Sequence, residues 1–179
     1  VLANGSMSSN TLSEGEIRKK MIQGDVIEAM ISLPSQLFLN TQVPCCLWFL
    51  TNDKTKNGRD RRNETLFIDA RNLGSMETRS LKIFTSKDIY KIENTFSKWI
   101  KGENYEDING FCKSSTNEDI EKNNFVLMPG IYVGLEELED DGVSFQNKLN
   151  ELSDNFQKIS KKILELENKI QSILKLISN

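Results

Sequence analysis

The chain has 179 residues, with 23 lysines and arginines, 26 aspartates and glutamates and no histidine, so its formal net charge is −3. This length fits one domain with an appendage, and the acidic balance excludes a broad cationic surface, so any DNA contact must be local or shared with another subunit. The lack of histidine excludes Ser-His-Asp and Cys-His nucleophiles, histidine-ligated zinc and imidazole acid–base chemistry.

The first seventy residues predict the later part of an α/β sheet. Residues 1–3 resemble the end of a buried strand and run into turn residues, which indicates a truncated domain. A helix capped by Ser13 is expected over 14–23, ending at Gly24. Three apolar runs then predict strands at 26–33, which is buried on both faces, 43–50 and 66–70. We expect the final strands to pair antiparallel and the first half of the sheet to be missing.

A polar segment joins the second and third of these strands and carries five cations, Lys54, Lys56, Arg59, Arg61 and Arg62. One interpretation is a solvated hairpin loop, because runs of charge usually form solvated surface. The other is a contact with DNA phosphates.

Two capping patterns predict helices in the second half of the chain. Thr85 followed by Asp88 predicts a helix that ends at Gly102 and has an apolar face of Ile89, Ile92, Phe96 and Ile100. Thr116 followed by Asp119 predicts a short helix ending near Asn123.

A heptad pattern predicts one long helix at the end of the chain, about 50 Å long at roughly 1.5 Å per residue. Its apolar seam consists of Phe145, Leu149, Leu152, Phe156, Ile159, Ile163, Leu166, Ile170, Ile173 and Ile177. Each large side chain left in water forgoes roughly 1.5–3 kcal/mol of burial, so another element should cover the seam. Packing on this chain's own helices is one solution. A partner chain is favoured, because no other segment offers a seam of that length.

Several stretches resemble the C-terminal half of the methylase domain of type I restriction-modification modification subunits. They are residues 1–8 (VLANGSMS), 15–18 (GEIR), 33–38 (LPSQLF), 41–50 (TQVPCCLWFL), 65–71 (TLFIDAR) and 125–134 (FVLMPGIYVG). The resemblance implies that residues 1–135 are the C-terminal part of a methyltransferase domain and that residues 136–179 are a helical extension for subunit association, of coiled-coil type.

The resemblance also implies a Rossmann-like, S-adenosylmethionine-dependent enzyme that methylates the exocyclic N6 amine of adenine after flipping the base out of the duplex. Its expected partners are DNA, a specificity subunit, a second modification subunit and a restriction subunit. The DNA target sequence would be read by the specificity subunit.

The sequence departs from the family at its catalytic motifs. The family binds its cofactor through a glycine-rich turn and holds the target amine with an Asn-Pro-Pro-Phe/Tyr motif, whereas here Pro34, Pro44 and Pro129 stand apart. We therefore expect no catalytic, cofactor-binding or metal-ligating residue in this chain, and neither S-adenosylmethionine binding nor methyl transfer by the chain alone.

Phe38 is one position that can be carried over, because related enzymes place an aromatic residue against the flipped base before the antiparallel hairpin. Stacking on a base commonly contributes about 1–3 kcal/mol. Plain core packing is the alternative, since phenylalanine is often buried. The neighbouring polar residues Asn40, Thr41 and Gln42 could touch the DNA backbone, or could simply favour a turn.

Three functions remain open from the sequence: a part of an enzyme, an interaction module that docks residues 145–177 on the specificity subunit, and a DNA-binding module built on residues 54–62. The acidic balance weighs against the third. No run approaches the roughly eighteen apolar residues of a membrane span, and residues 1–5 lack a signal-peptide pattern. Cys45, Cys46 and Cys112 have neither disulfide nor metal-ligand spacing. We expect a cytoplasmic protein that makes no membrane contact.

Overall fold

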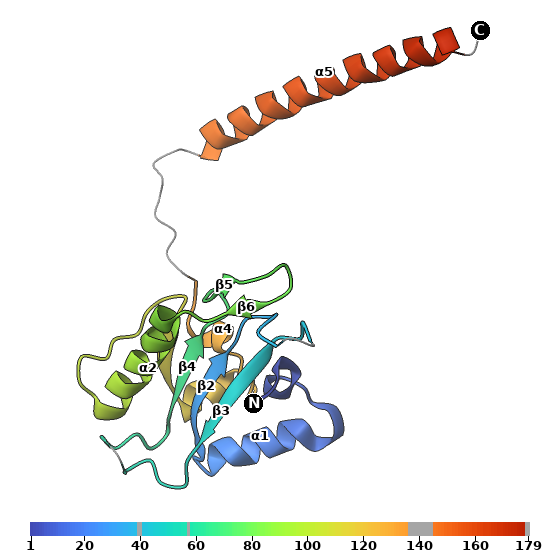
Figure 1. Ribbon diagram of the computed structural model, residues 1–179. Coiled ribbons are helices and arrows are strands. Elements are labelled where there is room, and N and C mark those ends of the chain that lie inside the picture. Colours follow the sequence, from blue (N-terminus) through green and yellow to red (C-terminus); the bar gives the residue numbers. More distant parts are fainter. Residues whose placement is uncertain (39–40, 57, 136–144, 178–179) are drawn as a thin grey trace. The chain divides into compact units, whose positions relative to one another are not determined.

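The computed structural model describes residues 1–38, 41–56, 58–135 and 145–177 (Figure 1). The chain divides into two compact units, Val1–Glu137 and Leu138–Asn179. The first unit is built around a mixed β-sheet, and the second contains one long helix. Each unit is described by itself below.

The main sheet of the first unit has five strands in the order β1-β3-β2-β4-β7. Their bounds are β1 Leu2–Ala3, β2 Ile27–Ser32, β3 Cys45–Leu50, β4 Glu64–Asp69 and β7 Cys112–Thr116. Strands β2 and β4 are parallel, with Ala29 opposite Leu66, whereas the other three pairings are antiparallel. A separate small hairpin pairs β5 (Ser75–Met76) with β6 (Lys82–Ile83).

Helices cover both faces of this sheet. They are α1 Glu14–Gln23, α2 Ser86–Lys101, α3 Asn117–Lys122 and α4 Pro129–Tyr132, and two 3₁₀ turns (Asn4–Met7 and Thr11–Ser13) precede α1. One core joins Met30 and Phe67 of the sheet to Ile22 of α1, Ile120 of α3 and Tyr132 of α4. The second core, on the opposite face, joins neighbouring sheet residues to Trp99 of α2. Successive side chains of β2 and β4 point to opposite faces of the sheet and so contribute to both cores. These central strands are therefore apolar on both faces.

Most predicted elements are confirmed, including α1, β2, β3, β4, α2 and α3. Thr85 and Thr116 both make full capping boxes with Asp88 and Asp119. The predicted antiparallel hairpin of the 43–50 and 66–70 strands is wrong, because β2 lies between β3 and β4 and pairs antiparallel with β3 and parallel with β4. Strand β7 and the β5–β6 hairpin were not predicted, because they are short and carry little apolar signal.

Three local expectations are wrong. Ser13 makes no side-chain capping hydrogen bond to α1, and its backbone is left-handed (φ 73°) instead of the extended conformation that N-cap residues adopt. Leu2 and Ala3 are exposed at the end of the sheet instead of buried. Ile89 is 55% exposed, whereas Ile92, Phe96 and Ile100 of the predicted apolar face pack against the second core. The buried residues of α2 are Thr95 and Trp99, which the predicted face did not include.

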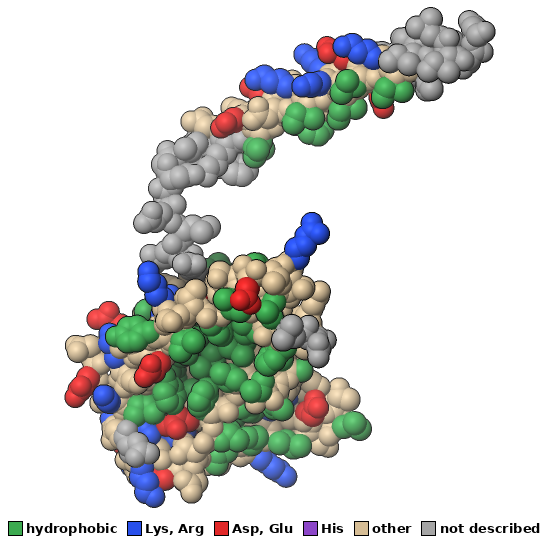
Figure 2. Space-filling view, viewed as in Figure 1, with side chains coloured by type: hydrophobic (Ala, Val, Ile, Leu, Met, Phe, Trp, Pro, Cys, Tyr) green, Lys and Arg blue, Asp and Glu red, His purple; other side chains and the backbone are tan. Residues whose placement is uncertain are grey.

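The second unit contains helix α5, Phe145–Ile177, as the heptad pattern predicts. Its described seam residues, Leu149, Leu152, Phe156, Ile159, Ile163, Leu166 and Ile170, are between 47% and 72% exposed. The side chain of Ile173 lies outside the described part of the chain. The helix therefore presents a continuous apolar seam, as Figure 2 shows for part of its length.

Candidate nucleic-acid interface

The predicted DNA-contacting residues lie at two opposite ends of the sheet. Phe38 and Gln42 follow β2, whereas the cationic loop of residues 52–63 joins β3 to β4. Because β3 runs antiparallel to β2, this loop returns to the start of β2, where the Thr51 amide donates to the Val26 carbonyl at 2.9 Å. Six residues of β2, at about 3.3 Å each, separate the two groups by roughly 20 Å. The structure therefore does not gather them into one site.

Phe38 lies in the connection between β2 and β3 with 43% of its surface exposed. The Thr41 amide donates to the Phe38 carbonyl at 3.3 Å, and Thr41 and Gln42 are exposed. Asn40 lies outside the described residues. Phe38 is therefore not a core residue, and its ring is accessible at the carboxyl end of β2.

Two of the five loop cations are buried in ion pairs that anchor the loop to the sheet. The Lys54 ammonium, 2% exposed, donates to Asp25 at 2.7 Å and to the Glu64 carbonyl at 2.6 Å. Burial lowers the pKa of Lys54, while its hydrogen bond to Asp25 acts in the opposite direction. The Arg61 guanidinium, also 2% exposed, donates to Glu28 at 2.9 Å. These two side chains hold the loop in place and are not available to a phosphate.

The other three loop cations are also ion-paired, but nearer the surface. The pairs are Arg59 with Glu64 at 2.5 Å, Arg62 with Asp60 at 2.6 Å and Lys56 with Asp53 at 3.3 Å. The hydrogen bond from Arg59 is the main reason why the pKa of Glu64 is lowered, and that from Arg62 lowers the pKa of Asp60 to about 2. Any DNA contact by this loop is thus limited to these three side chains and competes with their own carboxylates.

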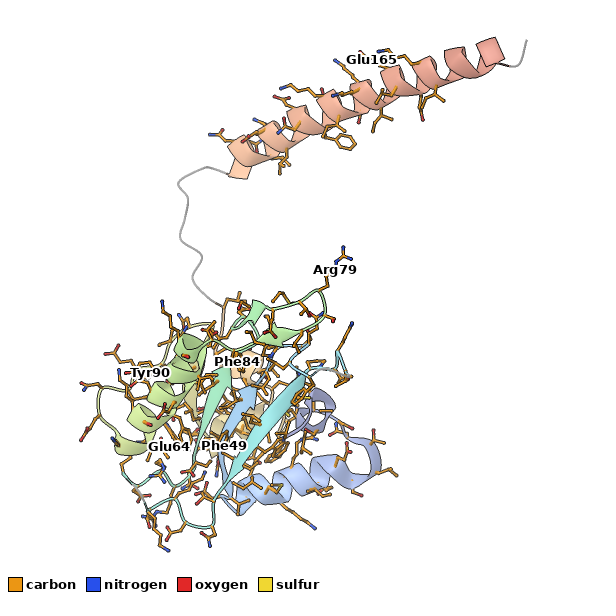
Figure 3. All side chains as sticks on the ribbon, in the orientation of Figure 1. Phe49, Glu64, Arg79, Phe84, Tyr90 and Glu165 are labelled. Atoms are coloured by element: carbon orange, nitrogen blue, oxygen red, sulfur yellow. The ribbon has the colours of Figure 1, made fainter. Side chains whose placement is uncertain are left out.

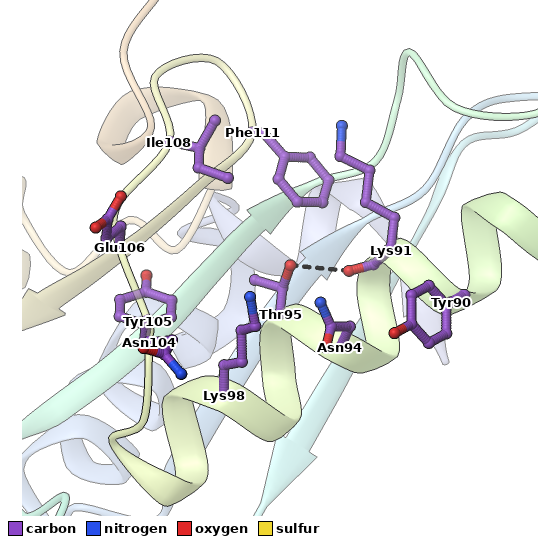
Figure 4. Close-up of a pocket in the computed structure, with 10 residues that line it drawn as sticks. All are labelled: Tyr90, Lys91, Asn94, Thr95, Lys98, Asn104, Tyr105, Glu106, Ile108 and Phe111. Atoms are coloured by element: carbon purple, nitrogen blue, oxygen red, sulfur yellow. Dashed lines mark hydrogen bonds between the residues drawn. The ribbon is translucent and has the colours of Figure 1, made fainter.

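A cleft of about 320 Å³ lies between α2 and the segment 104–111. Lys91, Asn94 and Lys98 of α2 are on one wall, and Ile108 and Phe111 are on the other (Figure 4). The Lys91 ammonium lies 4.0 Å from the centre of the Phe111 ring, a cation–π contact. Sequence analysis missed this cleft, because no periodic pattern marks the segment that forms its second wall.

The described residues at the carboxyl ends of the parallel strands are apolar or ion-paired. A bound S-adenosylmethionine would be expected at the carboxyl ends of the parallel strands. There, β2 runs into Leu33 and Pro34, and the Asp69 carboxylate at the end of β4 is held by Arg71 at 2.5 Å.

No described group of three or more histidine, cysteine, aspartate or glutamate side chains could hold a metal ion. No helix in the described ranges is long and apolar enough to span a membrane.

These features define an α/β domain with a mixed sheet. A family model for N-6 DNA methylases matches residues 1–141. The methylase subunit of the type I restriction enzyme HindI from Haemophilus influenzae is 53% identical over 149 residues, which are 83% of this chain and 32% of the relative. The MjaIX methylase subunit from Methanocaldococcus jannaschii is 39% identical over 153 residues, 84% of this chain and 26% of the relative. The chain belongs to the N-6 DNA methylase family and spans about a third or less of these relatives.

Solved structures agree with this assignment. The type I restriction-modification methyltransferase subunit from Streptococcus thermophilus superposes with a TM-score of 0.60 at 27% identity, covering 73% of this chain and 25% of that one. The EcoKI M protein, at 13% identity, has a TM-score of 0.56 over 92% of this chain and 40% of its own, which supports the fold alone.

Proposed function

We propose that this chain is the C-terminal part of a modification subunit that transfers a methyl group from S-adenosylmethionine to N6 of adenine in DNA. The proposal is supported by an apolar rim that borders β1 and β3, in a chain that covers 32% of its relative in Haemophilus influenzae. The rest of the parent polypeptide would supply the cofactor site and the residues that hold the target amine.

The rim occupies both faces of the sheet beside its terminal strand β1. On one face, a groove of about 220 Å³ is lined by Leu2, Ile17, Met21, Trp48 and Leu50. On the other face, Phe49 is part-exposed, and hydrophobic side chains gather across the middle of the surface in Figure 2, where Figure 3 labels Phe49 and Phe84. Exposed apolar side chains on both faces of a sheet edge are typical of an edge that other parts of a protein cover, because their burial stabilises the fold.

Phe38 has a position that suits contact with the flipped base. It is exposed at the carboxyl end of β2, and ligands of open α/β sheets bind outside the carboxyl ends of the strands. In the complete subunit, Phe38→Ala should weaken base flipping, as measured by 2-aminopurine fluorescence at the target adenine. Phe38→Tyr keeps an aromatic face and is the matched control. Unchanged flipping in Phe38→Ala would remove the stacking role.

Helix α5 is proposed to associate with the specificity subunit, in a cytoplasmic complex that also contains a second modification subunit and restriction subunits. Ile163→Asp places a charge in the exposed seam and should abolish retention of the specificity subunit in a pull-down. Leu164→Asp is the matched control, because Leu164 is also an exposed apolar residue but lies outside the seam. Equal losses in both variants would contradict docking through the seam. A lower stability of residues 1–135 after removal of α5 would indicate packing within the chain instead.

Methyl transfer is tested with a hybrid subunit. The upstream two thirds of the HindI methylase subunit, joined to this chain and combined with a specificity subunit, should transfer labelled methyl groups from S-adenosylmethionine to adenine. This chain alone should transfer none. Transfer by the chain alone, or an inactive hybrid that folds and assembles, would contradict the proposal.

A further inference from the structure

Helix α2 carries a lysine face, defined here as Lys87, Lys91, Lys98 and Lys101. At about 100° of rotation per residue these four positions fall within an arc of roughly 80°, with Asn94 in the middle. The fourteen steps from Lys87 to Lys101 rise about 21 Å at roughly 1.5 Å each. Lys87, Lys91 and Lys101 are exposed, and Lys98 is half-buried at the cleft.

The lysine face makes no ion pair within the described part of the chain, in contrast to the loop of residues 52–63, and its one described partner is the Phe111 ring beside Lys91. Within the described part of the chain, no carboxylate lies within 4.0 Å of any of its four ammonium groups. Asp88 of the same helix is engaged with Thr85 in the capping box, and Glu93 points about 120° away from the centre of the face.

Acidic groups of the opposite wall are few and partly engaged. Asp107 accepts hydrogen bonds from the Tyr105 hydroxyl and the Ser114 amide, both at 2.9 Å. Glu106 lines the cleft across from α2. Glu103 is exposed in the segment just after the end of α2. None of these three carboxylates lies within ion-pairing distance of the four lysines.

The lysine face runs between the two ends of the sheet that hold the predicted DNA contacts. At the Phe38 end, the Lys82 amide of β6 donates to the Gln36 carbonyl at 2.8 Å, and Thr85 starts α2 three residues later. At the other end, the Arg59 amide donates to the Ile100 carbonyl at 2.9 Å. One end of helix α2 therefore lies near the β2–β3 segment that contains Phe38, and the other end lies near the loop of residues 52–63.

We propose that the lysine face binds the phosphate backbone of duplex DNA. The inference rests on the proposed function in taking DNA as the ligand. A length of about 21 Å corresponds to roughly six nucleotides of one strand at about 3.4 Å each. Four ammonium groups without an ion pair supply phosphate contacts, although Lys91 also rests on the Phe111 ring. Tyr90 and Asn94 beside them are also residue types that contact the sugar-phosphate backbone. Such contacts hold the duplex in place and read no sequence.

The test uses this 179-residue chain and a fluorescent 30-base-pair duplex, with binding followed by anisotropy between 50 and 200 mM KCl. Four phosphate contacts give a slope of about −3.6 for the logarithm of affinity against the logarithm of salt, or roughly a 150-fold loss over this range. Replacing all four lysines by glutamine should remove most of this slope. A control variant with Lys19, Lys20, Lys113 and Lys122 replaced by glutamine changes the net charge equally and should keep it.

Three results would overturn the proposal. They are no binding at 50 mM salt, equal losses in the two quadruple variants, or binding of polyglutamate as tight as that of DNA, which would indicate an acidic protein partner. Far-ultraviolet circular dichroism of both variants confirms that they fold. This assay needs neither cofactor nor upstream polypeptide, so its failure is separate from failure of the hybrid to methylate DNA.

Discussion

The buried pair of Arg61 and Glu28 allows a quantitative test of what holds the 52–63 loop. In Glu28→Ala, the Arg61 guanidinium stays 2% exposed and loses its carboxylate, keeping only the Arg59 and Lys56 carbonyls as acceptors. Removing one partner of a buried pair costs about 3–5 kcal/mol. Because two carbonyls remain, we expect a loss of about 3 kcal/mol, which is roughly 10 °C in Tm for a unit of this size.

Urea unfolding measures this loss as a lower midpoint at an unchanged slope. Asp60→Asn is the control, because the Asp60–Arg62 pair in the same loop is exposed, and we expect no measurable shift. The double change Glu28→Leu with Arg61→Met should recover most of the stability, because apolar replacement of a whole buried pair is often neutral. Equal midpoints for Glu28→Ala and Asp60→Asn would refute the view that the buried pair anchors the loop.

Three further predictions concern the first unit. Glu64 has a lowered pKa because Arg59 donates to it, so its contribution to stability is complete above the ordinary glutamate pKa and is lost as pH falls through the lowered folded value. Glu64→Gln should therefore flatten the acid side of a pH–stability curve, and an unchanged curve would contradict this. Thr85→Ala removes the cap of α2 and should cost about 1 kcal/mol in urea unfolding. Gly58→Ala would place a Cβ 2.2 Å from the Ile100 carbonyl oxygen and should lower Tm strongly, whereas Gly5→Ala, with open space around it, should leave Tm nearly unchanged.

The sequence was sufficient for elements whose signal is local. Apolar runs predicted β2, β3 and β4, and the Thr-x-x-Asp patterns predicted the starts of α2 and α3, because capping involves residues three apart. Strand β7 was missed because its alternation of Cys112, Lys113 and Ser114 carries almost no apolar contrast, and its pairing with β4 is a tertiary interaction.

The candidate site shows the limits of local reasoning more clearly. In the sequence, residues 54–62 look like a solvated cationic run. The carboxylates that bury Lys54 and Arg61 in ion pairs are Asp25 and Glu28, which are remote in sequence, so this burial could be seen only in three dimensions. Conversely, the lysines of α2 are scattered along the sequence and come together only through the helical repeat. The net charge of the chain predicted neither the ion-paired cations of the 52–63 loop nor the lysine face of α2.

The central claim is that the sheet continues beyond β1 in the parent protein. Amide hydrogen exchange on peptides covering residues 1–8 and 43–50 tests it directly, in this chain and in the hybrid with the upstream HindI sequence. We expect rapid exchange around β1 and the start of β3 in the chain alone and strong protection in the hybrid. Identical exchange in the two proteins, with the hybrid folded, would show that nothing packs on this edge and would contradict the account.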